Sequence, residues 1–343
     1  MIPHSRPNFG EPFLQAAERV IRSGQLAQGG EVARLEAVVA KRFGQSSAVA
    51  VDSGSSAIML ALQALKMTRS VQRVGIPAYG CRALYFAVRA AGAEPVCMDC
   101  GDDLRLDTTK ANETAQTVDA VVLVHPFGMI EPMVAAAWPC PIIEDVAQSA
   151  GGTLDGKPLG SFGDVAVTSF YATKPWGGAY GGVAVCRDEM LADTMRHMRD
   201  ADTAEASLPY AGNHHLSDMH AALALVRIEL AAVEAEKRMS LAHQYDAWLT
   251  DAMAVPVERH LDGICYRYIV RAPEGGAEAC IGKLHSLGVG AARPVAVSLD
   301  HLTGGETPVA RRAVEECVSL PLLPDMSEQE RFMMREAIQA CMR

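Results

Sequence analysis

Short apolar runs that alternate with helical stretches constrain the fold of this chain more than any other feature of its sequence. The predicted strands are 47–51, 71–76, 95–98, 120–124, 141–143, 166–170 and 183–185. Helical spacing of apolar residues predicts helices over 32–43, 55–65 and 82–91. Such apolar strands, spaced by helices, are typical of an α/β fold whose mostly parallel central sheet is flanked by helices on both faces. Little room remains between the last two strands, so we expect the sheet to turn antiparallel there.

The pattern changes after about residue 215. A long stretch rich in Ala, Leu and Glu predicts a helix over 220–239, followed by a second helix over 241–252 that ends before Pro256. The remaining elements are a strand near 264–270 and helices near 277–287, 308–317 and 327–342. Because 343 residues exceed the usual size of a single core, we expect a large domain over 1–240 and a smaller C-terminal α+β domain over 241–343.

Charge and hydropathy exclude two classes of partner. The net charge is −10 and lysines and arginines form no cluster, which argues against binding to nucleic acid. No apolar run is long enough to span a bilayer, and the first residues carry no apolar signal segment, so we expect no membrane contact and a cytoplasmic location. The nine cysteines lie mostly within apolar runs, as reduced core residues do.

Two groupings of metal-binding residue types occur in the sequence. Cys97 and Cys100 have C-x-x-C spacing, but no second such pair and no nearby histidine pair completes a zinc site, so they read as the end of a buried strand. His214 and His215 are adjacent, and adjacent residues of a regular element point to different faces. We therefore expect no metal.

Two residues that follow apolar runs indicate a pyridoxal phosphate site. Asp145 ends the run that begins at Pro141, and Lys174 follows it by 29 residues in an aromatic and glycine-rich segment. This cofactor needs a lysine for its aldehyde and an aspartate that keeps its ring nitrogen protonated. The alternatives are a helix cap for Asp145 and a surface position for Lys174. Gln148, one turn after Asp145, is expected to contact the phenolic oxygen of the cofactor.

A small-residue turn precedes the helix predicted over 55–65. The amides at its N-terminus, with the hydroxyls of Ser55 and Ser56, can hold a phosphate, although serines there are more often plain caps. Ser169, at the end of a predicted strand, offers a second phosphate contact. Trp176 contacts either substrate or the core beneath its loop, and the sequence does not decide between them.

Motifs in a fixed order resemble the DegT/DnrJ/EryC1/StrS aminotransferase family, whose members are fold-type I pyridoxal phosphate enzymes that aminate keto sugars. The resemblance covers nearly the whole chain. Its motifs lie at 22–29, 53–55, 91–96, 124–128, 144–148, 160–164, 169–174, 212–213 and 320–324.

The resemblance implies a role for each matching residue. Lys174 would form the Schiff base and move the proton, Asp145 would pair with the pyridine nitrogen, and Gln148 would touch the phenolate. The residues implied to hold the phosphate are Ser55, Ser56 and Ser169. The family's counterpart of Asn213 reaches the cofactor of a neighbouring subunit, which implies a homodimer with shared active sites.

Three positions depart from the family pattern. Cys81 stands where the family usually stacks an aromatic ring on the cofactor, a contact that Tyr79 or another aromatic residue would have to supply. Tyr180 replaces a glutamate, and His215 stands where an arginine is expected. These departures lie around the substrate, so we expect a divergent substrate pocket.

The sequence therefore predicts an aminotransferase that moves an amino group from an L-amino acid, glutamate by resemblance, to a nucleotide-linked keto sugar or a keto-cyclitol. Two half-reactions in one site imply ping-pong kinetics. Two alternatives stay open: amination of a non-sugar ketone, and a regulatory protein that keeps the fold without turnover. A branch of the family that dehydrates sugars has histidine in place of the lysine, and Lys174 argues against it.

Overall fold

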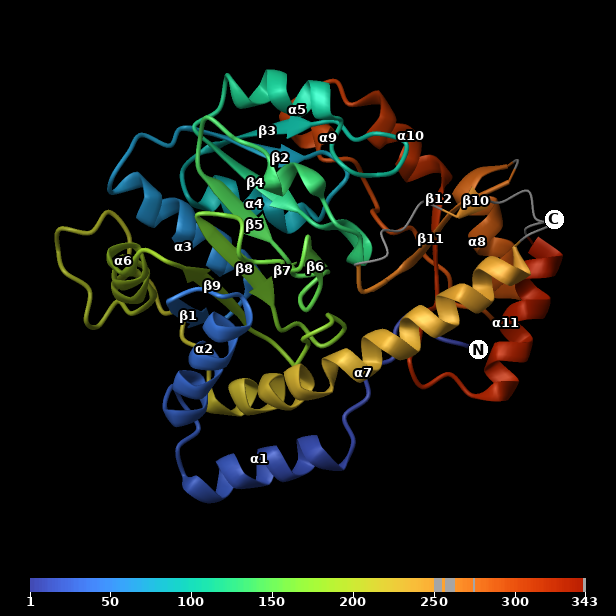
Figure 1. Ribbon diagram of the computed structural model, residues 1–343, viewed down its shortest axis with the longest axis horizontal. Coiled ribbons are helices and arrows are strands. Elements are labelled where there is room, and N and C mark those ends of the chain that lie inside the picture. The colour runs from blue at the N-terminus through green and yellow to red at the C-terminus, as the bar shows by residue number, and fades with distance from the viewer. Residues whose placement is uncertain (250–254, 257–262, 274, 342–343) are drawn as a thin grey trace.

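The computed structural model describes residues 1–249, 255–256, 263–273 and 275–341. Within them, a seven-stranded sheet in the order β1-β9-β8-β5-β4-β2-β3 forms the centre of the molecule (Figure 1). Its strands are β1 (Ser47–Val51), β2 (Arg73–Pro77), β3 (Glu94–Met98), β4 (Ala120–Val124), β5 (Ile142–Asp145), β8 (Val165–Ser169) and β9 (Gly182–Cys186). The neighbours of β9 both pair with it antiparallel, and the other pairs are parallel. The predicted mixed sheet is confirmed.

Helices cover both faces of this sheet because its strands are apolar on both sides. Val49 and Val51 face a core formed with α3 (Gly54–Lys66), α4 (Arg82–Ala90) and α6 (Glu189–Arg199). Ala48 and Ala50, which alternate with them, face a second core formed with α2 (Gly30–Arg42) and the long helix α7 (Asp218–Trp248). Helix α1 (Glu11–Ser23), which the sequence pattern missed, packs on α7.

Helix α7 corrects the prediction of two helices over 220–239 and 241–252. It runs without interruption for 31 residues, because no glycine or proline occurs within it and its residues are mostly strong helix formers. Its first half packs on the sheet, and Leu241, Ala242 and Tyr245 belong to a different core. The predicted end at 252 lies outside the described residues.

A smaller α+β unit follows α7. A three-stranded antiparallel sheet, β10 (Val255–Pro256), β11 (Tyr268–Arg271) and β12 (Cys317–Leu320), packs with α8 (Gly276–Ser286) and α11 (Glu328–Cys341). Shorter elements complete the described chain: α5 (Thr108–Ala115), η1 (Pro126–Gly128), η2 (Pro132–Ala135), β6 (Thr153–Leu154), β7 (Lys157–Pro158), α9 (Asp300–Thr303) and α10 (Pro308–Glu316). Strand β12 has no counterpart among the predicted elements.

The N-terminal segment reaches the C-terminal unit. Ile2 is buried in the core that contains β11, β12 and α11, and it forms a bridge with Val289 (Figure 1). The predicted division between 240 and 241 falls inside α7 and stays a prediction. No helix among the described residues has the length and apolar character needed to cross a membrane.

Candidate active site

A cavity of about 290 Å³ lies where β5 and β8 end and α3 begins. Strands of an α/β sheet present functional groups at this edge, where the helix that follows also points its free amides. Six of the predicted site residues line this cavity together: Ser55, Cys81, Asp145, Gln148, Ser169 and Lys174. The structure thus brings together residues that are up to 119 positions apart in the sequence.

The turn before α3 is built by close approach of the backbone. Ser53 caps the helix, because its Oγ accepts a hydrogen bond from the amide of Ser56 at 3.1 Å. The Ser56 hydroxyl lies 2.9 Å from the Ser53 hydroxyl, and Ser56 is not among the residues that line the cavity. A Cβ on Gly182 would lie 2.4 Å from the amide nitrogen of Gly54, so only glycine allows β9 to pass the turn. The phosphate contact of Ser56 stays a prediction.

Asp145 ends β5 with its carboxylate turned into the cavity. Its Oδ1 accepts a hydrogen bond from the amide of Ala147 at 2.9 Å. Burial raises the pKa of Asp145, and this effect outweighs the amide of Ala147 and the nearby cation of Lys174. A buried carboxylate with so little compensation is suited to a cationic partner such as a protonated ring nitrogen.

The preceding residue, Glu144, fixes the loop segment 160–163 to the end of β5, next to Asp145. Its side chain is fully buried and accepts hydrogen bonds from the amides of Gly160, Phe162 and Gly163 at 2.6 to 2.9 Å. His125 donates from Nε2 at 3.2 Å, because its Nδ1 accepts from a backbone amide. Burial alone would raise the pKa of Glu144, but these donors outweigh burial and hold the pKa below its ordinary value.

Gln148 has one side-chain group engaged and one free for a ligand. Its Oε1 accepts a hydrogen bond from the amide of Phe127 at 2.9 Å. That bond orients the side-chain amide, whose NH₂ has no partner among the described residues, and Gln148 lines the cavity. An NH₂ donor at this place fits the predicted contact with a phenolic oxygen.

Lys174 lies in a tight turn between β8 and β9. Its amide donates to the carbonyl of Tyr171, its carbonyl accepts from Gly177, and both distances are 2.8 Å. A Cβ on Gly177 would lie 2.4 Å from the Tyr171 carbonyl oxygen, so the glycine permits this turn. Within the described ranges the Lys174 ammonium forms no ion pair, and its Nζ lies 5.7 Å from the centroid of the Tyr266 ring. The amine is therefore available to a ligand.

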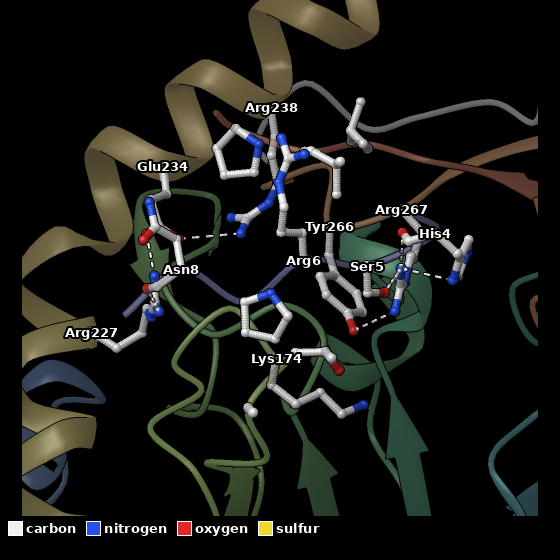
Figure 2. A pocket seen from close by; sticks show the side chains of 16 residues that line it. His4, Ser5, Arg6, Asn8, Lys174, Arg227, Glu234, Arg238, Tyr266 and Arg267 are labelled. Atoms are coloured by element: carbon white, nitrogen blue, oxygen red, sulfur yellow. Dashed lines mark hydrogen bonds and ion pairs between the residues drawn. The ribbon is translucent and has the colours of Figure 1, made fainter. Parts of the chain in front are cut away.

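Tyr266 and Arg267 belong to the site but were missed by the sequence interpretation. Figure 2 shows the Tyr266 ring between Lys174 and Arg267, with its hydroxyl directed to the guanidinium. Burial raises the pKa of the Tyr266 phenol, but the cations of Arg267 and Lys174 outweigh burial and leave the pKa below its ordinary value. The only signal in the sequence was a polar pair inside an otherwise apolar predicted strand.

A second cavity of about 360 Å³ adjoins the first one. The two share Cys81, Val124, Gln148 and Lys174, and the second extends to Arg267 and Arg293 in the C-terminal unit. The first cavity is thus floored by the sheet, while the second lies between the sheet and the C-terminal unit. This arrangement provides separate space for a cofactor and for a substrate.

The remaining predicted residues have different surroundings. Asn213 is exposed on the loop before α7 and lines neither cavity, so its reach to a partner subunit stays a prediction. Tyr79 is buried against Phe127. Trp176 stacks on Phe43 at 5.2 Å with 2% of its surface exposed, which decides for the packing alternative.

The two groupings of metal-binding residue types do not converge in the structure. His214 contacts Asp52, whereas His215 contacts a different carboxylate, that of Asp200. Burial raises the pKa of Cys97 to about 11 and that of Cys100 to about 12, so both remain protonated thiols at neutral pH. In the described part of the chain, no three His, Cys, Asp or Glu side chains gather as metal ligands would.

Residues 7–339 match the family model of the DegT/DnrJ/EryC1/StrS aminotransferase family. A curated protein of Geobacillus stearothermophilus, called a pleiotropic regulatory protein, is 28% identical over 95% of this chain and 93% of its own. The aminotransferase TlmJ from Streptoalloteichus hindustanus superposes with a TM-score of 0.90 at 25% identity, covering 99% of this chain and 98% of that one. DesV from S. venezuelae superposes with a TM-score of 0.86 at 26% identity, covering 96% and 93%.

Proposed function

Because the chain belongs to the DegT/DnrJ/EryC1/StrS aminotransferase family and has the fold of the pyridoxal-phosphate-dependent aminotransferases, we propose a specific role for each residue of its site. Lys174 binds the aldehyde of the cofactor and carries the proton that moves during transfer. Asp145 faces the ring nitrogen, and Gln148 donates to the phenolic oxygen. The bound cofactor supplies the electron sink that amino transfer requires.

The shape and chemistry of the first cavity support these roles. Its buried carboxylate lies at one wall, the Lys174 amine at another, and the N-terminus of α3 with Ser55 at a third. Each of these groups suits one part of the cofactor: the carboxylate suits the cationic ring, the amine suits the aldehyde, and the helix N-terminus suits the phosphate. Ser169 lies next to Gly54 at the start of α3, since a Cβ on Gly54 would lie 3.1 Å from the Ser169 side chain, and this position supports a contact of Ser169 with the phosphate. The convergence of Lys174 with Asp145 is the observation that carries the proposal.

We infer that the amino donor is an L-amino acid, glutamate by family resemblance, and that the acceptor is a nucleotide-linked keto sugar or a keto-cyclitol. The second cavity adjoins Lys174 and carries both polar and apolar groups, as recognition of a polyhydroxylated ring requires. Donor and acceptor occupy this space in turn, which gives ping-pong kinetics. Location in the cytoplasm remains part of the proposal.

An absorbance spectrum tests the first half-reaction. The purified protein with pyridoxal phosphate should show the visible band of a lysine-bound cofactor, and L-glutamate should convert it to the amine form. Lys174→Ala should lack the band, while Lys157→Ala, which removes a surface lysine of β7, should keep it. A protein that binds no cofactor, or whose cofactor does not respond to any amino donor, would favour a regulatory role such as that named for the Geobacillus relative.

We further propose a homodimer in which Asn213 reaches the partner's cofactor. Tyr171 and Tyr180 lie at the cavity and are 46% and 60% exposed, so this side of the site lacks a cover within one chain. Mixing two variants tests this arrangement. Lys174→Ala and Asn213→Ala, each impaired alone, should recover activity when mixed, because one heterodimer site then has both residues intact. No recovery in a sample shown to exchange subunits would mean that Asn213 serves its own chain.

A further inference from the structure

The wall of the site above Lys174 is strongly cationic. A hollow next to the cavities is lined by Lys174 and by four arginines, Arg6, Arg227, Arg238 and Arg267 (Figure 2). A surface that gathers so many cations beside a reactive amine is suited to an anion.

Three of these four arginines already hold a carboxylate. Arg6 pairs with Glu330 at 2.7 Å, and Arg227 and Arg238 share Glu234. Arg227 also donates to two backbone carbonyls and so ties the N-terminal segment and the loop after Lys174 to α7. Their charges are neutralised within the protein, so they build the wall rather than bind a ligand.

Arg267 differs because all its partners are neutral. Its Nη1 donates to Ser5 Oγ at 2.9 Å, and its Nη2 donates to the Tyr266 hydroxyl at 3.0 Å. The third neighbour is His4, whose pKa is lowered to about 4 by burial and by the Arg267 charge itself. Across residues 1–249, 255–256, 263–273 and 275–341, no carboxylate lies within ion-pair distance of Arg267, although Arg267 lines both the second cavity and the hollow beside Lys174.

Two N–H groups of the Arg267 guanidinium have no partner among the described residues. A guanidinium carries five N–H groups, and the described contacts of Arg267 use those of Nη1 and one of Nη2, which leaves Nε–H and the second Nη2–H for a ligand. That pair of donors matches the two oxygens of a carboxylate. The Tyr266 ring, 4.6 Å from Cζ of Arg267 and 5.7 Å from Nζ of Lys174, holds the two cations at a fixed spacing.

We propose that Arg267 binds a carboxylate of the amino donor and so orients the donor's amino group toward Lys174. This inference rests on the proposed aminotransferase function and names the residue that selects the donor. Tyr266 is a positioning residue, because it accepts one hydrogen bond from Nη2 and leaves the second Nη2–H for the ligand. An amino acid donor always carries a carboxylate next to its amino group, whereas the ketone of an acceptor sugar needs no charge-paired partner at this place.

The test follows cofactor absorbance during the donor half-reaction with three probes. L-Glutamate carries both carboxylates, L-glutamine lacks the side-chain carboxylate, and L-isoglutamine lacks the α-carboxylate. Arg267→Gln should raise the half-saturating concentration of glutamate at least tenfold, as loss of a charge-assisted hydrogen-bond pair does. Arg267→Lys should give a half-saturating concentration between those of the wild type and Arg267→Gln, because lysine keeps the positive charge but cannot donate two parallel hydrogen bonds to a carboxylate. Arg271→Gln removes a nearby arginine at the end of β11, which pairs with Glu316, and it should leave glutamate binding unchanged.

The probes identify the carboxylate that is bound. If the penalty of Arg267→Gln persists for glutamine and disappears for isoglutamine, Arg267 binds the α-carboxylate, and the reverse pattern assigns the side-chain carboxylate. Glutarate, which has two carboxylates and no amine, should bind the wild-type holoenzyme in calorimetry and bind Arg267→Gln at least tenfold more weakly. An equal penalty with all three amino acids, or none, overturns the assignment.

The failure of this inference is separable from failure of the proposed function. If the wild-type protein converts its cofactor with glutamate and Arg267→Gln does so equally well, only the role of Arg267 is lost. If the wild-type cofactor responds to no amino donor, the proposed function itself is wrong, and glutarate binding still reports whether Arg267 is an anion site.

Discussion

Substitution of Glu144 by glutamine should destabilise the protein far more than its small chemical change suggests. The side chain is buried completely and accepts four hydrogen bonds, three from the amides of Gly160, Phe162 and Gly163 and one from His125. Oε2 accepts from two of those amides. Glutamine places an NH₂ group at one oxygen position, so donors face donors there whichever way the amide turns.

The cost follows from the bonds that are lost. A buried donor left without a partner costs about 1 to 3 kcal/mol, and two donors are stranded at either orientation of the glutamine. We therefore expect the free energy of unfolding to fall by roughly 3 to 5 kcal/mol, the size typical of a broken buried network. Because Glu144 precedes Asp145 on β5, pyridoxal phosphate should also bind more weakly.

Chemical denaturation of the cofactor-free protein, followed by circular dichroism, measures this cost. The matched control is Glu94→Gln, which changes an exposed glutamate and should cost less than about 0.5 kcal/mol. The pKa of Glu144 is lowered in the folded state, so its stabilising effect is present above its ordinary value of 4.5 and is lost as the pH falls below that value. The difference in free energy of unfolding between the wild type and Glu144→Gln should thus become smaller in acid. A loss below 1 kcal/mol at pH 7 would refute the account.

Three further substitutions test the site itself. Asp145→Asn should stabilise the cofactor-free protein at pH 7, because the raised pKa of the buried carboxylate makes its charge unfavourable above the ordinary carboxyl pKa. The same substitution should abolish amino transfer. Thermal melts across pH 3 to 8 (roughly the range in which carboxylates titrate) show whether the variant is more stable than the wild type at neutral pH and loses that advantage in acid. Gly182→Ala should lower the free energy of unfolding by about 2 to 4 kcal/mol and weaken cofactor binding, since its Cβ would collide with the backbone of Ser53 and Gly54. Gly156→Ala is the control, because its Cβ would meet no atom and the positive φ of Gly156 leaves backbone strain as its only cost. Cys81→Tyr should tighten pyridoxal phosphate binding about fivefold, near 1 kcal/mol, if the cavity lacks a stacking ring; unchanged affinity in a fluorescence titration would show that another group already fills that place.

The sheet was predictable because local sequence and burial agree there. The strands β1 and β4 have the bounds expected from their apolar runs, since each is buried on both faces and needs no polar alternation. Asp145 and Lys174 were found for a related reason. Each lies at or just beyond the end of a buried strand, where a charged residue stands out against its neighbours.

What the sequence could not show depends on long-range contacts. Arg267 lies 262 residues from Ser5, which accepts its hydrogen bond, and nothing local to either residue indicates the pair. The Ser56 hydroxyl lies against the Ser53 hydroxyl, and this contact depends on the geometry of the turn, which the sequence alone does not show. Trp176 looked equally suited to substrate and core until the position of Phe43 was known.

Helix α7 makes the two halves of the molecule mechanically inseparable. At 1.5 Å per residue its 31 residues extend for about 46 Å, longer than a small domain is wide. One end is embedded in the core with the sheet and the other in the core with β11, while Ile2 crosses in the opposite direction. A fragment that begins at 241 would lose Ile2 and the part of α7 that anchors it to the sheet. Neither half would then keep a closed core, so unfolding of the chain should be a single event and limited proteolysis should release no stable piece of either half.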